Sequence, residues 1–308
     1  MSFSSDTKAE LCQQKFDKKS CAAAECYGVL MYCNTFSPTD IRIITANADF
    51  AQRLPRLFRR AFSLEFDYLP SESCQGKRSF EITDEEKIEK ILSVYGADRE
   101  NLLNHHVNFG VLEDENDRIA FLRGAFLAGG SVTDPQKSYH LELATPHRSA
   151  SREVYTLLLE LGFTPKETHR AGNSLLYFKQ ADAIADFFTA IGASNTAMEI
   201  MTAKVDKEMR NTVTRQINCD AANADKTVIA AQNQIHIIKS FVVENGLDSL
   251  PDDLRDTALL RITNPEASLS DLARLSMPPV TKSALNYRLK KLMKLCQTDP
   301  STAEEEKL

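Results

Sequence analysis

The sequence predicts an α+β domain built from two copies of one structural unit, followed by an all-α domain that contains a helix-turn-helix. Three observations support this. Segments about a hundred residues apart share one order of helices and strands. The helix that heads each copy carries small residues at matched positions, Gly28 and Gly124. Near the C-terminus, a short helix, a Pro-Pro turn and a basic helix follow one another.

The duplication accounts for residues 19–96 and 115–192 of a domain that we expect to span residues 1–195. In both copies the hydrophobic periodicity predicts the order helix, strand, amphipathic helix, two short strands and a closing helix. The expected elements are, in the first copy, 23–36, 41–46, 49–62, 64–70, 77–83 and 83–96, and in the second, 119–132, 139–145, 147–161, 164–170, 174–179 and 181–192.

Small residues stand four apart in both leading helices, Ala24 with Gly28 and Gly124 with Ala128. That spacing places them on one stripe, along which two helices can approach closely. Small core residues alone would explain one such pair. Their recurrence at matched positions predicts that the two helices pack on each other across a pseudo-twofold axis.

This arrangement resembles the LAGLIDADG homing-endonuclease fold over roughly Lys19 to Gly192. The family motif falls on residues 122–130, and the resemblance implies that its second acid would bind catalytic magnesium. Gly129 stands at that place in the second copy and Cys33 in the first. Because magnesium-assisted hydrolysis needs carboxylate ligands, we expect the fold without nuclease activity, no metal and no cofactor.

The helix-turn-helix is predicted over Ser268 to Leu295. Ser268 is a candidate N-cap for the first helix, with Asp271 in its first turn. Pro278 and Pro279 must end that helix, and Thr281 can cap the next one. On the second helix an apolar seam at i, i+4 and i+7 faces a core: Leu285, Leu289 and Leu292.

The other sides of the second helix carry the residues that we predict to bind DNA. Such a helix needs cations for phosphates and a few polar groups that reach base edges. Asn286 could pair with adenine, and Arg288 could contact guanine or a phosphate. The predicted set is Thr281, Lys282, Ser283, Asn286, Tyr287, Arg288, Lys290, Lys291 and Lys294. The alternative is a solvated basic surface helix.

Between the two domains we expect a linker helix over residues 196–222, in which Arg210 and Arg215 are candidates for phosphate contacts. The C-terminal domain is expected over 223–296, with further helices over 221–244, capped by Gly246, and 252–262. Residues 297–308 are predicted to be a disordered acidic tail.

Composition limits the remaining function classes. The 308 residues carry a net charge of −6, so DNA contacts must come from local basic patches. No apolar stretch reaches spanning length and no signal peptide is apparent, which predicts a cytoplasmic, nucleoid-associated protein without membrane contact. The seven cysteines and the pair His105-His106 show no zinc spacing, and the acidic run 113–117 reads as a solvated loop.

The whole pattern resembles the WhiA family of bacterial sporulation regulators. The segments that carry the resemblance are 121–131, 215–223 with Lys226-Thr227, 264–269, Lys282-Ser283, Asn286 and Arg288-Leu289. One departure is Thr214, where the family's usual pair would place asparagine before Arg215. The resemblance implies sequence-specific binding of double-stranded DNA and regulation of transcription in cell division, sporulation and chromosome segregation, without catalysis.

Two other functions remain open at this point. The duplicated domain could be a module that binds a protein partner, such as a component of the transcription or division machinery, or a small ligand, with DNA contact secondary. An active homing endonuclease is the more remote alternative, which the missing acids disfavour.

Overall fold

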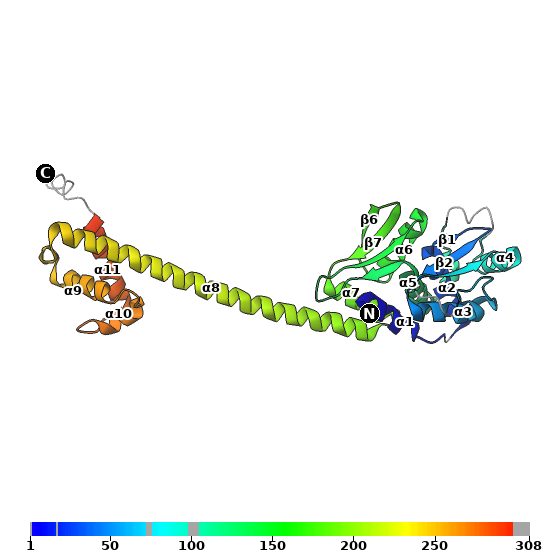
Figure 1. Cartoon of the computed structure of the whole chain (residues 1–308), viewed down its shortest axis with the longest axis horizontal. Coiled ribbons are helices and arrows are strands. Elements are labelled where there is room, and N and C mark those ends of the chain that lie inside the picture. Colours follow the sequence, from blue (N-terminus) through cyan, green and yellow to red (C-terminus); the bar gives the residue numbers. More distant parts are fainter. Residues whose placement is uncertain (1, 17, 72–75, 98–104, 298–308) are drawn as a thin grey trace. The chain divides into compact units, whose positions relative to one another are not determined.

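The computed structural model describes all residues except 1, 17, 72–75, 98–104 and 298–308. It divides into two compact units, Met1–Glu208 (unit 1) and Met209–Leu308 (unit 2), and each is considered by itself (Figure 1). The division falls inside the predicted linker helix. The predicted disordered tail lies outside the described residues, apart from Gln297.

Unit 1 contains the predicted duplication. After the N-terminal helix α1 (Phe3–Cys12), the first copy comprises α2 (Lys19–Tyr32), β1 (Thr35–Phe36), β2 (Ile41–Thr45), α3 (Ala48–Phe62), β3 (Arg78–Ile82) and α4 (Glu85–Val94). A short 3₁₀ helix (Phe109–Val111) leads to the second copy, which comprises α5 (Glu115–Gly129), β4 (Gly130–Val132), β5 (Leu141–Thr145), α6 (Arg148–Glu160), β6 (Lys166–Arg170), β7 (Asn173–Phe178) and α7 (Ala181–Ile191).

Each copy forms its own antiparallel sheet. The first has the order β1-β2-β3 and the second β4-β5-β7-β6. The strand predicted over residues 64–70 is wrong. This segment meets β3 only at an isolated bridge between Tyr68 and Glu81, and Tyr68 and Leu69 are exposed there. Among the residues that the structure describes, the first sheet therefore has no counterpart of β6.

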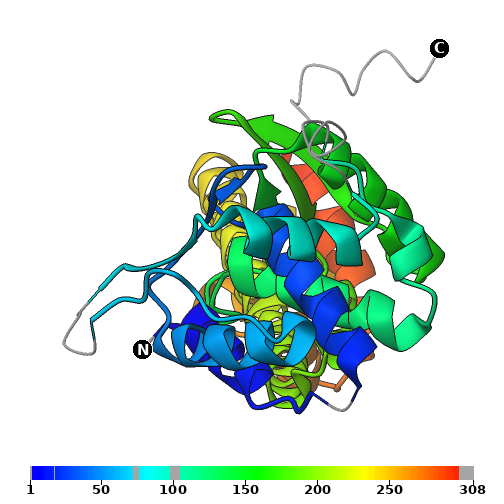
Figure 2. The same cartoon turned by 90° about the vertical axis from the view of Figure 1, so that its right-hand side faces the viewer.

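The two leading helices, α2 and α5, lie side by side at the centre of unit 1, as predicted (Figures 1 and 2). Their contact is backbone against backbone. A Cβ atom on Gly28 would lie 1.9 Å from the carbonyl oxygen of Phe121, and one on Gly124 would lie 2.0 Å from that of Glu25. Only glycine permits this approach, which explains the matched small residues.

A buried ion cluster crosses the same interface. Glu25 of α2 accepts from Arg53 of α3 at 2.6 and 2.9 Å and from Arg123 of α5 at 3.3 Å. Arg53 also donates to the carbonyl oxygens of Cys12 and Gln14, so its buried guanidinium is well satisfied. The cluster thereby joins both copies and the segment that follows α1.

Helix α8 (Ser194–Asn245) continues without interruption through the residues where we expected two helices. Residues 216–225 contain neither glycine nor proline, so nothing in the sequence stops the helix there. The separate helices expected over 196–222 and 221–244 are one element.

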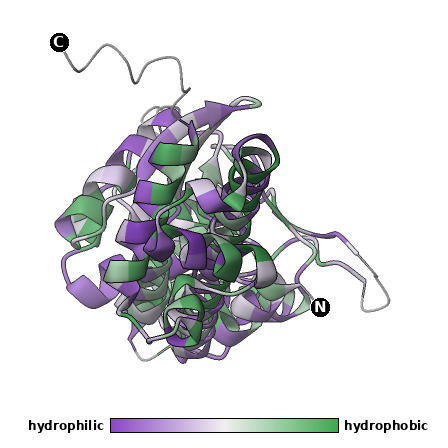
Figure 3. Cartoon of the chain, turned by 90° about the vertical axis from the view of Figure 1, so that its left-hand side faces the viewer, coloured by the Kyte–Doolittle hydropathy of each residue, from purple (hydrophilic) through white to green (hydrophobic). Residues whose placement is uncertain are grey.

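Unit 2 packs α9 (Asp252–Thr263), α10 (Leu269–Leu275) and α11 (Lys282–Gln297) against the C-terminal part of α8, after a 3₁₀ turn (Leu247–Ser249). The helix predicted over 252–262 is thus present. The core of unit 2 is small and aliphatic. Ile238, Leu254 and the leucine seam of α11 are fully or almost fully buried in it. Figure 3 shows hydrophobic and hydrophilic residues intermixed along the helices of the chain.

Candidate nucleic-acid interface

The helix-turn-helix has the caps that the sequence predicts. The Ser268 hydroxyl accepts from the backbone N–H of Asp271 and donates to its carboxylate at 2.6 Å. At the second helix, the Thr281 hydroxyl accepts from the N–H of Ala284 at 3.2 Å. The turn between them contains a cis peptide bond, Met277-Pro278. Both helix starts are therefore fixed by side chains.

Helix α11 is divided as predicted into a buried seam and an open face. Leu285, Leu289 and Leu292 are at most 1% exposed. The predicted DNA-binding residues that are exposed are Thr281, Lys282, Ser283, Tyr287, Lys290, Lys291 and Lys294. Because the seam anchors the helix, these side chains are presented by a rigid element.

The open face is positive and uncompensated by its own helix, since α11 contains no acidic residue. Lys282, Lys290 and Lys291 form no ion pair with any residue that the structure describes. Exposed cations without carboxylate partners can neutralise phosphates without first breaking an ion pair.

Asn286 and Arg288 are half-buried on opposite flanks of this face. Arg288 lines a cavity of about 340 Å³ between α9 and the turn, together with Asp256 and Met277. Arg288 is therefore less exposed than the lysines of this face. Asn286 does not line this cavity.

The structure places Arg210 and Arg215 at exposed positions of α8. Five residues of an α-helix turn through about 140°, so the two side chains leave the helix in different directions. One straight helix cannot present both to a single phosphate backbone. The expectation that each contacts phosphate stays a prediction, and the two are best tested separately.

A second place of interest is the C-terminal ends of α2 and α5, where the LAGLIDADG motif has its acids. Gly129 is enclosed, because a Cβ atom there would lie 2.4 Å from the carbonyl oxygen of Ala144 and 2.8 Å from the Tyr32 ring. Cys33 is buried, and its Sγ lies 3.1 Å from the carbonyl oxygens of both Leu30 and Thr35, either of which can accept its one proton. Burial raises the pKa of its thiol to about 12, so it stays protonated. Among the described residues, no group of three or more His, Cys, Asp or Glu could hold a metal.

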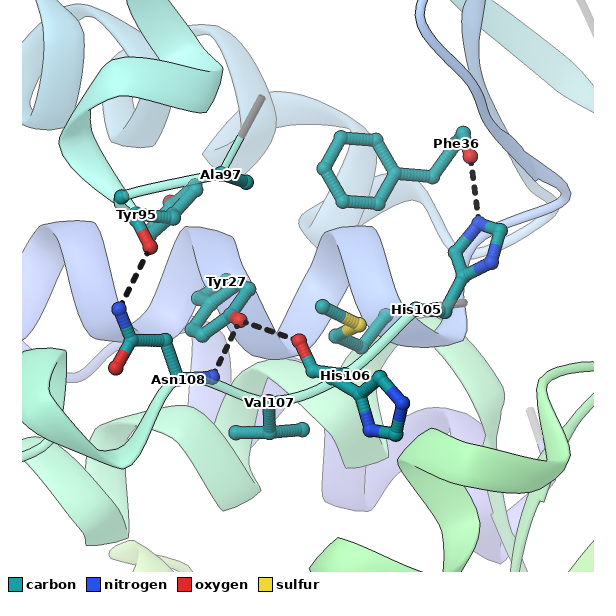
Figure 4. A pocket seen from close by; sticks show the side chains of 10 residues that line it. Tyr27, Phe36, Tyr95, Ala97, His105, His106, Val107 and Asn108 are labelled. Carbon is teal, nitrogen blue, oxygen red and sulfur yellow. Dashed lines mark hydrogen bonds between the residues drawn. The ribbon is translucent and has the colours of Figure 1, made fainter. Parts of the chain in front are cut away.

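No partner for His105-His106 is apparent from the sequence, but the structure provides one for each. His106 Nδ1 lies 2.7 Å from Glu153 of α6, and His105 Nε2 lies 2.7 Å from the carbonyl oxygen of Phe36 (Figure 4). The Tyr27 hydroxyl donates to the carbonyl oxygen of His106. These bonds tie the connection between the copies to both of them. Periodicity could not reveal them, because they join an irregular segment to distant elements.

A cavity of about 310 Å³ lies beside this connection (Figure 4). Tyr27 and Tyr95 stack there with ring centroids 4.1 Å apart. His105 stacks on His147 at 3.5 Å, and the Nε2 atom of His147 is buried without a partner in the described part of the chain. Burial, and then the neighbouring His105, lowers the pKa of His147 to about 4.

The stability of unit 1 should therefore fall as the pH is lowered from about 6.5 to 4. Between these pH values His147 is protonated in the unfolded chain but stays neutral in the folded chain, so a fall in pH favours unfolding. We expect His147→Gln to reduce the loss of urea midpoint between pH 7.5 and pH 5. His169→Gln, on the exposed strand β6, is the control and should leave the loss unchanged. An identical loss in wild type and His147→Gln would refute this assignment.

No helix among the described residues is long and apolar enough to cross a membrane.

Comparison with known proteins gives one consistent result. Residues 213–296 match the family described as WhiA C-terminal HTH domain, and residues 118–210 match the WhiA LAGLIDADG-like domain. A protein named "Probable cell division protein WhiA" from Clostridium perfringens is 34% identical over 96% of this chain and 98% of its own. One of the same name from Staphylococcus haemolyticus is 35% identical over 96% of each. The crystal structure of full-length DUF199/WhiA from Thermotoga maritima superposes with a TM-score of 0.59, at 25% identity, over 96% of this chain and 98% of the other.

Proposed function

Because the chain belongs to the WhiA family, whose C-terminal part is a helix-turn-helix domain, we propose that it regulates transcription by sequence-specific binding of double-stranded DNA. The observation that supports this best is the open face of α11, an exposed row of cations and polar groups on a helix anchored by three buried leucines. In the proposed mechanism α11 enters the major groove.

The residues of this face make two kinds of contact with DNA. Lys282, Lys290, Lys291 and Lys294 neutralise phosphates and set the register of the helix on the duplex. Asn286 and Tyr287 meet base edges, and Arg288 meets guanine or a phosphate. Arg215 and Arg210 of α8 are candidates for additional phosphate contacts.

The names of the relatives suggest the process that is regulated. Relatives that cover nearly the whole chain are named probable cell division proteins. We propose that the target genes serve cell division, with chromosome segregation and sporulation as related roles. DNA binding would associate the protein with the nucleoid.

We also propose that unit 1 is not a nuclease. Gly129 and Cys33 supply no carboxylate where the LAGLIDADG motif needs one, and the enclosure of both positions supports this. Magnesium-dependent cleavage of plasmid DNA by the purified chain would refute the proposal.

A double substitution, Lys290→Gln with Lys291→Gln, tests the DNA-binding proposal. We expect binding to weaken about tenfold on every sequence at about 0.1 M salt, because two phosphate contacts are lost. The slope of log affinity against log salt should fall by roughly 1.8. Fluorescence anisotropy over a salt series measures both quantities.

Two controls sharpen this test. Lys90→Gln with Lys137→Gln removes the same charge from exposed positions of unit 1 and should leave the slope unchanged. Asn286→Ala should alter the selected sequence, whereas the double lysine variant should select the same one more weakly. Wild-type affinity and slope in the α11 lysine variant would rule out docking through this face.

A further inference from the structure

We propose that the open face of α11 is also the docking surface for an acidic segment of the same chain, residues 298–308, which occupies it when DNA is absent. This inference rests on the proposed DNA-binding role of the face and concerns its regulation. Complementary charges, the length of the segment and its position directly after α11 support this inference.

The charges of the two partners are complementary. The segment reads TDPSTAEEEKL and carries four acids, Asp299, Glu304, Glu305 and Glu306, against one lysine. The helix that it follows presents lysines and no acid on its open face. Lys282, Lys290 and Lys291 have no ion-pair partner among the described residues, so their charge is available to an incoming anion.

The segment is long enough for the contact. Helix α11 has 16 residues and is therefore about 24 Å long. Glu304 to Glu306 follow Gln297 by seven to nine residues, which span up to roughly 25–30 Å when extended. Lys290 and Lys291 lie only about 10 Å along the axis from the end of the helix. The acids can reach every lysine of the face.

The attachment strengthens a contact that would be weak between separate molecules. Exposed ion pairs contribute little individually, but a short tether holds the acids near the lysines at an effective concentration in the millimolar range. DNA presents more charge and releases counterions, so it displaces the segment. The segment acts as a competitor that lowers affinity for weakly bound DNA and weakens as salt is added.

Two variants test this in the full chain. One ends at Gln297, and the other keeps the length but is neutral, with Asp299→Asn, Glu304→Gln, Glu305→Gln and Glu306→Gln. Both retain the buried leucines that anchor α11. We expect each to bind DNA about three- to tenfold more tightly than wild type at low salt, with the difference vanishing as salt rises.

A measurement without DNA separates contact from general repulsion. Acetylation of individual lysines, followed by mass spectrometry, should show Lys290 and Lys291 reacting at least about twofold faster in both variants, with exposed Lys226 of α8 as the internal reference. A synthetic peptide of residues 298–308 at millimolar concentration should restore the protection to the truncated chain.

The outcomes distinguish this inference from the proposal beneath it. If no form of the chain binds DNA, the proposed function is wrong, whatever the lysines do. If wild type binds DNA and the variants match it in affinity, the docking inference is wrong. Tighter DNA binding with unchanged lysine reactivity also overturns it, because repulsion without contact would then explain the affinity.

Discussion

Replacing Gly124 by alanine should destabilise unit 1 by about 3 kcal/mol. The new methyl group would lie 2.0 Å from the carbonyl oxygen of Glu25, and this neighbour is backbone that no side-chain rotation can move. The helices α2 and α5 must separate, and separation loosens the packing along the whole interface. Thermal unfolding, with hydrogen exchange of the α2 and α5 peptides, measures the loss.

Gly28→Ala should have an effect of the same size, because its methyl group would meet the carbonyl oxygen of Phe121 at 1.9 Å. The two substitutions should not be additive, since one separation of the helices relieves both clashes. Gly110→Ala is the matched control, because its nearest neighbour is the end of the Asn108 side chain at 3.1 Å. Wild-type stability in Gly124→Ala would contradict the close helix contact.

Removing the central carboxylate of the ion cluster should be comparably damaging. Glu25→Ala leaves Arg53, which is 1% exposed, without a counterion and leaves Arg123 without its acid. Breaking a buried pair from one side costs about 3–5 kcal/mol, because the remaining charge stays desolvated. Urea unfolding measures the loss of stability, and hydrogen exchange of the α2 and α3 peptides locates it.

A paired variant distinguishes charge from packing. Glu25→Leu with Arg53→Met replaces the pair by apolar side chains of similar length, and we expect it to recover much of the loss from Glu25→Ala. Glu65→Ala, which breaks the exposed ion pair with Arg59, should change stability by less than about 1 kcal/mol. A small effect of Glu25→Ala would mean that Arg53 is satisfied by backbone carbonyls alone.

The parts of the fold that sequence predicts are those with local signals. The caps Ser268 and Thr281 and the leucine seam lie in short windows, and Gly28 and Gly124 each lie in a short helical segment that recurs. The structure contains each of them. The segment 64–70 shows the limit of such signals. Its residues suit a strand, yet its pairing with β3 is reduced to one bridge, which composition does not reveal.

The candidate site divides in the same way. Which side of α11 is open follows from a leucine pattern that spans eight residues, so Lys290 and Lys291 could be placed from sequence. Arg288 lines a cavity together with Asp256 and Met277, which come from other parts of the chain. The His105 and His106 contacts depend on distant partners as well. Contacts between elements require the fold before they can be assigned.

The enclosure of Gly129 also bears on how this scaffold can change over evolutionary time. An acid at position 129 would need Tyr32 to shrink and the strand that contains Ala144 to move before the new side chain could be accommodated. Each of those changes alone disrupts the packing around Gly129. A single substitution that places an acid at position 129 is therefore disfavoured by the packing around it.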